Sequence, residues 1–86
     1  MPEVSGFYGI VIRMYFADHS PPHFHAEYGD YEALISIEEL TVIAGSLPSR
    51  ALGLVNEWAL LHRTELTTLW DKSRQLEALT KIEPLP

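Results

Sequence analysis

The sequence contains no cysteine, and this absence excludes disulfide bonds and thiolate metal sites. Basic residues are also scarce, because six Lys and Arg stand against twelve Asp and Glu and give a formal net charge of −6. A generic nucleic-acid-binding protein carries a basic excess that displaces phosphate counterions. Any contact with nucleic acid must therefore be local, and the acidic balance suits a basic partner.

Long apolar runs are missing as well. No stretch approaches the roughly 20 residues that span a bilayer, and the N-terminus lacks the basic and apolar regions of a signal peptide. We therefore expect a soluble cytoplasmic protein that does not contact membranes. Its 86 residues are 47% hydrophobic and 21% charged, which indicates one small globular domain over 1–86. The core of such a domain is thin, so a homo-oligomer or a partner protein would supplement it.

The first half of the chain is patterned like a sheet. Every even position from 7 to 16 is large and apolar, which predicts a strand over roughly 7–16 with one buried face. Gly29-Asp30 is a two-residue hairpin signal between strands at roughly 23–28 and 31–37. A fourth strand at 41–45 is plausible after a turn near Glu38-Glu39.

The hairpin signal also predicts the strand register. Tyr28 then faces Tyr31, and the pairs Ala26–Ala33 and Phe24–Ile35 continue one apolar face. The opposite face pairs Glu27 with Glu32, His25 with Leu34, and His23 with Ser36. A shift of one residue would mix the two faces, so this register is strongly favoured.

The second half is patterned like one helix over roughly 47–72. One stripe of a helical wheel carries mainly apolar residues, namely Ala51, Val55, Trp58, His62, Leu66 and Leu69. The tail over 75–86 carries two prolines and no clear secondary-structure signal. We therefore predict an α+β domain, in which a small antiparallel sheet of about three to four strands packs against one long C-terminal helix.

Three of the four histidines lie within seven positions, in Asp18-His19-Ser20-Pro21-Pro22-His23-Phe24-His25-Ala26-Glu27-Tyr28. His23 and His25 are two apart on a predicted strand and project from the same face. The polar face of the first strand is expected to adjoin them, and Asp18 lies in the loop at its edge. The candidate surface consists of Arg13, Tyr15, His19, His23, His25 and Glu27. Either X-Pro bond, Ser20-Pro21 or Pro21-Pro22, could be cis.

Three chemistries are open for this surface. His23 and His25 could bind a divalent metal together with Asp18, His19 or Glu27, because imidazole and carboxylate suit Zn²⁺, Mn²⁺ or Fe²⁺. Paired imidazoles could instead act as general acid and base, while Arg13 stabilises a phosphate-like charge in metal-free phosphodiester cleavage. In the third reading the histidines only contact a partner or the adjoining loop.

Several neighbouring residues need their own interpretation. Glu27 opposite Glu32 would repel across the hairpin, and either a cation such as Arg13 or a metal, or full solvation of both carboxylates, would relieve this. His62 lies in the apolar helix stripe and is expected to be a core residue hydrogen-bonded to backbone; the alternative is that it reaches the loop near His19. Both tryptophans are expected to be packing anchors.

The chain resembles a bacterial family known as domain of unknown function 4160. The resemblance covers nearly the whole chain and rests on Gly9–Phe16, Asp18–Tyr28, Leu47–Leu52 and Trp58–His62. Arg13, His19, His23, His25 and His62 match the family pattern. Members of the family are often encoded beside a small protein of the family called domain of unknown function 2442, and that pairing resembles a toxin–antitoxin module with this type of chain as the toxin.

The expected function is therefore a toxin-like protein that works through the histidine surface, as a ribonuclease with an RNA target, and is neutralised by a cognate small antitoxin-like protein. His19, His23, His25 and Arg13 are the candidate catalytic residues, and Asp18, Tyr15, Glu27 and His62 the candidate binding residues. Two alternatives remain, a non-catalytic protein-binding module and a small metal-dependent hydrolase.

Overall fold

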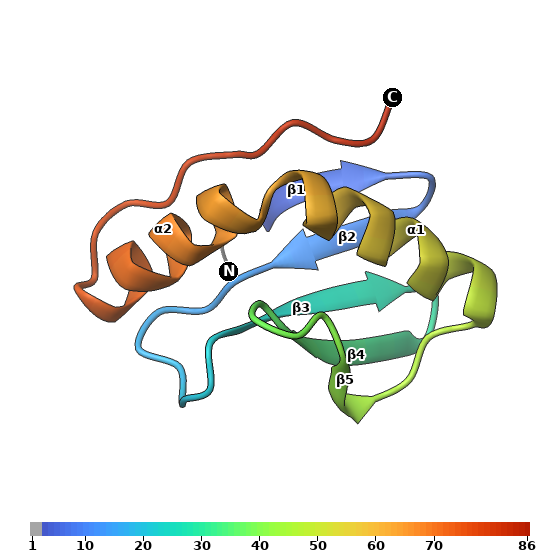
Figure 1. Ribbon diagram of the computed structural model, residues 1–86, viewed down its shortest axis with the longest axis horizontal. Coiled ribbons are helices and arrows are strands. Elements are labelled where there is room, and N and C mark those ends of the chain that lie inside the picture. Colours follow the sequence, from blue (N-terminus) through green and yellow to red (C-terminus); the bar gives the residue numbers. More distant parts are fainter. Residues whose placement is uncertain (1–2) are drawn as a thin grey trace.

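Five antiparallel strands form one sheet, and two helices cover one of its faces (Figure 1). The computed structural model describes residues 3–86 of the domain predicted over 1–86, so residues 1 and 2 lie outside the described part. The strands are β1 (Glu3–Phe7), β2 (Ile10–Arg13), β3 (His23–Tyr28), β4 (Tyr31–Ser36) and β5 (Val42–Gly45), and the helices are α1 (Ser49–Leu61) and α2 (Arg63–Arg74). Strand order in the sheet follows chain order. The α+β class is confirmed, with one strand more than the three to four expected.

The additional strand, β1, ends at Phe7 and so lies almost entirely before the segment predicted as one strand over 7–16, within which β2 covers Ile10–Arg13. The chain reverses at Tyr8 and Gly9, whose φ angles are 50° and 83°, and pairs β1 with β2. Positive φ at both central residues is the geometry of a type I′ two-residue hairpin. Ile10 and Ile12 are buried as predicted, but Tyr8 is 60% exposed and Phe16 43%. The period-two pattern runs through the turn without interruption and therefore does not reveal it.

The register of the β3–β4 hairpin is confirmed at every predicted pair. Tyr28 lies opposite Tyr31 across the Gly29-Asp30 turn, and the ladder continues in the same register to His23 opposite Ser36. The fourth predicted strand is present as β5, which pairs with β4. In the β3–β4 pair, Phe24, Ala26, Ala33 and Ile35 are buried on one face, whereas all four residues of β5 are exposed.

The predicted helix over 47–72 is two helices. A straight helix of that length would measure about 39 Å at 1.5 Å per residue, whereas the longest axis of the molecule is 33 Å. The helix is interrupted at His62, whose φ and ψ are −126° and 25°. The His62 N–H donates to the Ala59 carbonyl. The break lets both halves of the apolar stripe stay on the sheet. Within residues 3–86, neither helix is long and apolar enough to cross a membrane.

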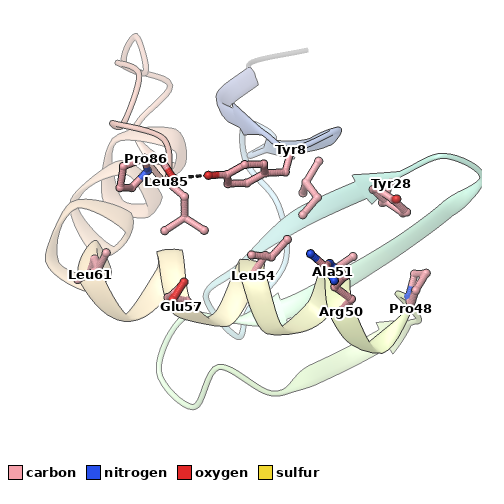
Figure 2. A pocket seen from close by; sticks show the side chains of 11 residues that line it. Tyr8, Tyr28, Pro48, Arg50, Ala51, Leu54, Glu57, Leu61, Leu85 and Pro86 are labelled. Carbon is pink, nitrogen blue, oxygen red and sulfur yellow. Dashed lines mark hydrogen bonds between the residues drawn. The ribbon is translucent and has the colours of Figure 1, made fainter.

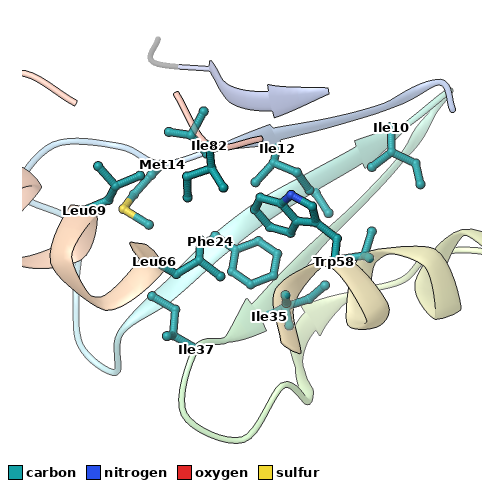
Figure 3. Close-up of a cluster of buried hydrophobic side chains, with 14 of the residues drawn as sticks. Ile10, Ile12, Met14, Phe24, Ile35, Ile37, Trp58, Leu66, Leu69 and Ile82 are labelled. Carbon is teal, nitrogen blue, oxygen red and sulfur yellow. The ribbon is translucent and has the colours of Figure 1, made fainter. Parts of the chain in front are cut away.

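Trp58 is the centre of the core between the helices and the sheet (Figure 3). Its ring is fully buried and lies 5.5 Å from the Phe7 ring and 5.8 Å from the Phe24 ring. Trp70 on α2 is also buried. Both tryptophans are thus packing residues, as predicted.

The C-terminal tail has no regular secondary structure, as predicted, but it is part of the packed molecule. It runs back along β1 (Figure 1). The Ile82 N–H donates to the Val4 carbonyl at 2.7 Å, and the Ile82 side chain is 4% exposed. The indole Nε1–H of Trp58 donates to the Glu83 carbonyl at 2.8 Å. The tail therefore closes the open edge of β1 and one end of the core.

A cavity of about 680 Å³ lies at the end of the sheet where the two hairpins turn (Figure 2). Tyr8, Tyr28, Leu54 and Leu85 are among its lining residues, and the Tyr8 hydroxyl donates to the Pro86 carbonyl beside it. This cavity is mostly apolar, and none of the four histidines lines it. We therefore place the candidate site at the other end of the strands, where the titratable groups gather.

Candidate functional site

The loop between β2 and β3 is held against the end of α2. The Ala17 N–H donates to the Ser73 carbonyl at 3.1 Å, and the Arg74 guanidinium donates to the Ser20 hydroxyl at 3.3 Å. The Ser20-Pro21 bond is cis. These contacts hold Asp18 over the first residues of β3, so that a loop carboxylate meets two strand histidines.

Asp18, His23 and His25 form one cluster, which we term the Asp–His–His cluster. The same carboxylate oxygen, Asp18 Oδ2, lies 3.0 Å from His23 Nε2 and 3.2 Å from His25 Nε2. One potential metal-ligand atom from each of the three residues lies within 4.8 Å of the other two. The second carboxylate oxygen, Oδ1, accepts the His19 backbone N–H at 2.8 Å. Three ligand-type atoms therefore converge, while the His19 N–H fixes the carboxylate through its other oxygen.

The second ring nitrogen, Nδ1, of each histidine in the cluster also has a hydrogen-bond partner. His23 Nδ1 lies 2.8 Å from the Pro21 carbonyl oxygen, and His25 Nδ1 lies 3.1 Å from Glu32 Oε2. A carbonyl or an ionised carboxylate only accepts hydrogen bonds, so Nδ1 of each ring carries a hydrogen. The Nε2 atoms are thereby directed at Asp18.

Aromatic rings complete the walls of the cluster. The Trp70 ring of α2 lies 5.2 Å from the His23 ring, and the Tyr15 ring meets the His25 ring edge-on at 4.4 Å and 75°. The side chains of His23, His25 and Asp18 are 6%, 14% and 22% exposed. His23 is thus enclosed, whereas His25 and Asp18 form the edge that solvent reaches.

Burial and neighbouring charges shift three titratable groups here. Burial acts to raise the pKa of Asp18, but hydrogen bonds from the His19 backbone and from His25, with the charge of His23, hold that pKa below its ordinary value. The pKa of Tyr15 is raised, first by burial and then by the carboxylates of Glu27 and Glu32. Asp18 therefore stays an anion, and Tyr15 stays a neutral phenol, at neutral pH.

Arg13 and Glu27 form an ion pair beside the cluster. This ion pair is one of the predicted ways to relieve the repulsion between Glu27 and Glu32. Arg13 Nε lies 3.2 Å from Glu27 Oε1, and this hydrogen bond is the main cause that raises the pKa of Arg13. Arg13 is also the direct cross-strand partner of His25. Arg13, His25 and Glu27 thus lie on one surface, as predicted. The positive charge of Arg13, and not solvation alone, reduces the repulsion between Glu27 and Glu32.

Two of the candidate histidines lie outside the cluster. The His19 side chain is exposed, and His19 contributes its backbone N–H. His62 lies 5.6 Å from Trp58 by ring centroids, and its Nδ1 lies 2.5 Å from Glu65 Oε1. The expectation that the His62 side chain is hydrogen-bonded to backbone is wrong, because its partner is the Glu65 carboxylate. The break between the helices brings Glu65, in the first turn of α2, within reach. His62 does not reach the loop near His19.

Sequence reasoning missed two residues of the site, Glu32 and Trp70. The predicted register places Glu32 opposite Glu27 and also diagonal to His25 on the same face. That diagonal relation was the available signal. Trp70 gave no such signal, because its place beside His23 depends on how α2 lies over the sheet.

The comparisons with known proteins bear on the whole of this region. The family model described as Domain of unknown function (DUF4160) matches residues 9–71, which include the Asp–His–His cluster. No match was found among curated proteins or among solved structures. Because the family model covers more than half of the chain, from β2 into α2, the chain belongs to the DUF4160 family.

Proposed function

We propose that this chain is the toxin-like component of a bacterial two-protein module, and that it cleaves RNA in the cytoplasm through the Asp–His–His cluster. A cognate small antitoxin-like protein would neutralise it. One observation carries the proposal: two imidazoles converge on one carboxylate oxygen at the partly exposed start of β3, the central strand of the sheet. Structural ion pairs alone do not require two histidines to share one carboxylate oxygen.

The surroundings of the cluster fit a phosphodiester substrate. Arg13 lies directly opposite His25 in the β2–β3 ladder, so both side chains project from the same face. An arginine bound to a phosphate oxygen stabilises the negative charge that develops during cleavage. Because His23 is enclosed by Trp70 and the loop, the solvent-facing edge of His25 and Asp18 is where a water molecule would be activated.

The test is controlled expression in a bacterial host, with growth and total RNA integrity followed over time. We expect the wild-type chain to arrest growth with RNA decay, because the cluster is intact. His25→Ala is expected to abolish both effects, while His19→Ala, a neighbouring exposed histidine outside the cluster, preserves them. Circular dichroism of both purified variants establishes that they are folded. Absence of arrest, or equal arrest by folded His25→Ala, would refute the ribonuclease proposal.

A second candidate function is a non-catalytic protein-binding module. It is favoured by the exposed loop that precedes β3, where Phe16 is 43% exposed and His19 and Pro21 are also open to solvent. In that case the double variant Phe16→Ala/His19→Ala would lose the cognate partner in a co-purification assay. His25→Ala would retain the partner and any growth effect, which is the opposite of the ribonuclease outcome.

A further inference from the structure

The hydrogen bonds of the cluster require positive charge between the Asp18 carboxylate and the two imidazole rings. A neutral imidazole has one N–H, and both His23 and His25 use that hydrogen at Nδ1. If the rings are neutral, both Nε2 atoms then present lone pairs to Asp18 Oδ2, which is itself only an acceptor. Lone pairs that face each other at 3.0 Å and 3.2 Å repel unless a positive charge lies between them. That charge is either a proton on each ring or a single metal ion bound by all three atoms.

The distances are compatible with one ion. Metal–nitrogen and metal–oxygen bonds of about 2.1 Å place neighbouring ligand atoms about 3.0 Å apart at octahedral angles and about 3.4 Å apart at tetrahedral angles. The two separations from Asp18 Oδ2, 3.0 Å and 3.2 Å, fall within this range. The carboxylate oxygen therefore lies from each ring at a separation that two ligands of one metal ion would show, and the three atoms lie within 4.8 Å of one another.

The hydrogen-bond partners of the two Nδ1 atoms are also of the kind found around metal sites. Histidines that ligate metals usually donate their other N–H to a carbonyl or a carboxylate, which fixes the tautomer and the ring orientation. His23 donates to the Pro21 carbonyl, and His25 donates to Glu32. The solvent-facing polar surface also has an excess of negative charge, since Asp18, Glu27 and Glu32 stand against Arg13, and a divalent cation would balance it.

We propose that Asp18 Oδ2, His23 Nε2 and His25 Nε2 bind one divalent transition-metal ion. Two imidazoles and one carboxylate suit Zn²⁺, Mn²⁺ or Fe²⁺ and leave coordination positions for water or a substrate oxygen. Because His25 and Asp18 form the solvent-facing edge, those open positions face outward. This inference goes beyond the proposed function, since the ion would bind whether or not the chain cleaves RNA.

Direct titration tests the site without any substrate. Tag-free protein is stripped with a chelator and titrated with Zn²⁺, Mn²⁺ and Co²⁺ by calorimetry, and Co²⁺ is followed in parallel by visible absorption. We expect one ion per chain, and a rise in melting temperature on binding because the ion binds the folded state. Mg²⁺ and Ca²⁺ at equal concentration should bind far more weakly, because both prefer all-oxygen ligands.

Matched variants assign the binding to the cluster. Asp18→Asn removes the anionic ligand but offers an amide N–H to a ring Nε2, so it should fold and lose stoichiometric binding. His25→Ala should also lose it, whereas His19→Ala should bind as the wild type does. Failure of the wild-type chain to bind any of the three transition metals would overturn the inference. Retention of one equivalent by folded Asp18→Asn or His25→Ala would do the same.

Glu32 provides a graded test of the same site as a positioning residue. Its carboxylate orients His25 through Nδ1 and does not lie among the three proposed ligands. Glu32→Ala should weaken the affinity by roughly 10–100-fold, as loss of such a supporting group typically does. Glu32→Gln should restore most of the affinity, because its amide oxygen still accepts the Nδ1 hydrogen. An unchanged affinity in folded Glu32→Ala would refute this positioning role. Metal binding without RNA decay would separate this inference from the ribonuclease proposal.

Discussion

At the scale of single residues, Gly45 controls how closely β5 approaches the strand that supports the site. Its φ is +75°, and a Cβ there would lie 2.1 Å from the Glu32 carbonyl oxygen. Real side chains never approach backbone so closely, so any other residue would force the two strands apart. Because Glu32 holds His25, this contact connects the packing of an edge strand to the cluster.

Gly45→Ala is therefore expected to destabilise the fold by about 3 kcal/mol, since it combines positive-φ strain with a backbone clash. Gly29→Ala is the matched control, because φ there is also positive, at +58°, but nothing lies within 4 Å of the added Cβ. It should cost only about 1 kcal/mol of strain. Urea unfolding followed by circular dichroism measures both. Equal losses for the two variants would show that the close approach to Glu32 contributes nothing.

At the scale of elements, the end of α2 both stops the helix and supports the site. The Glu77 N–H donates to the Lys72 carbonyl and the Leu76 N–H to the Ser73 carbonyl, which is the Schellman pattern of helix ends. The residue at its left-handed position is Leu76, with φ +59°. Glycine is the usual residue there, so the sequence contains a strained position next to the Ser73 carbonyl that anchors the site loop.

Leu76→Gly is expected to stabilise the protein by about 1 kcal/mol, because glycine adopts that φ without strain and Leu76 buries little surface, being 69% exposed. Gln75→Gly is the neighbouring control. Its φ is −94°, so glycine there brings only backbone entropy and should cost about 0.5–1 kcal/mol. Thermal unfolding of both variants decides the point, and a lower melting temperature for Leu76→Gly would contradict the strain argument.

At the scale of the whole molecule, helices, sheet and tail share one hydrophobic core. Residues from β1, β2, β3, α1 and α2 bury side chains in it, and Ile82 of the tail is buried with them. The tail also accepts the indole hydrogen bond of Trp58 and pairs with β1. A segment without regular secondary structure thus covers one side of the core. We expect its buried residue, Ile82, to stabilise the fold as much as a buried helix residue does.

Ile82→Ala should lower the free energy of unfolding by about 2–4 kcal/mol, because it removes buried methylene groups and leaves a cavity against the core. Thr80→Ala, two residues earlier and exposed, should change it by no more than about 0.5 kcal/mol. Chemical denaturation of the full-length chain compares them. If Ile82→Ala cost as little as Thr80→Ala, the tail would be a loosely attached segment.

Prediction from sequence succeeded where a short-range rule applied. The β3–β4 register follows from one turn and the alternation around it, since a shift of one residue would expose Phe24 and bury Glu27. The same rule placed His25, Arg13 and Glu27 on one face. It failed at Tyr8-Gly9 and at His62, because the hydrophobic period continues across both breaks and only the size of the core requires the chain to bend there.

The sequence by itself determined the α+β class, the hairpin register and the face that carries the histidines, because strand periodicity and turn chemistry act between near neighbours. Only the tertiary structure decided that Asp18, and not the side chain of His19, joins His23 and His25. That choice depends on α2, whose Ser73 and Arg74 hold the loop more than fifty residues away in the chain. Contacts between such distant segments leave no periodic signal, and they become visible only when the helices and sheet pack on one core.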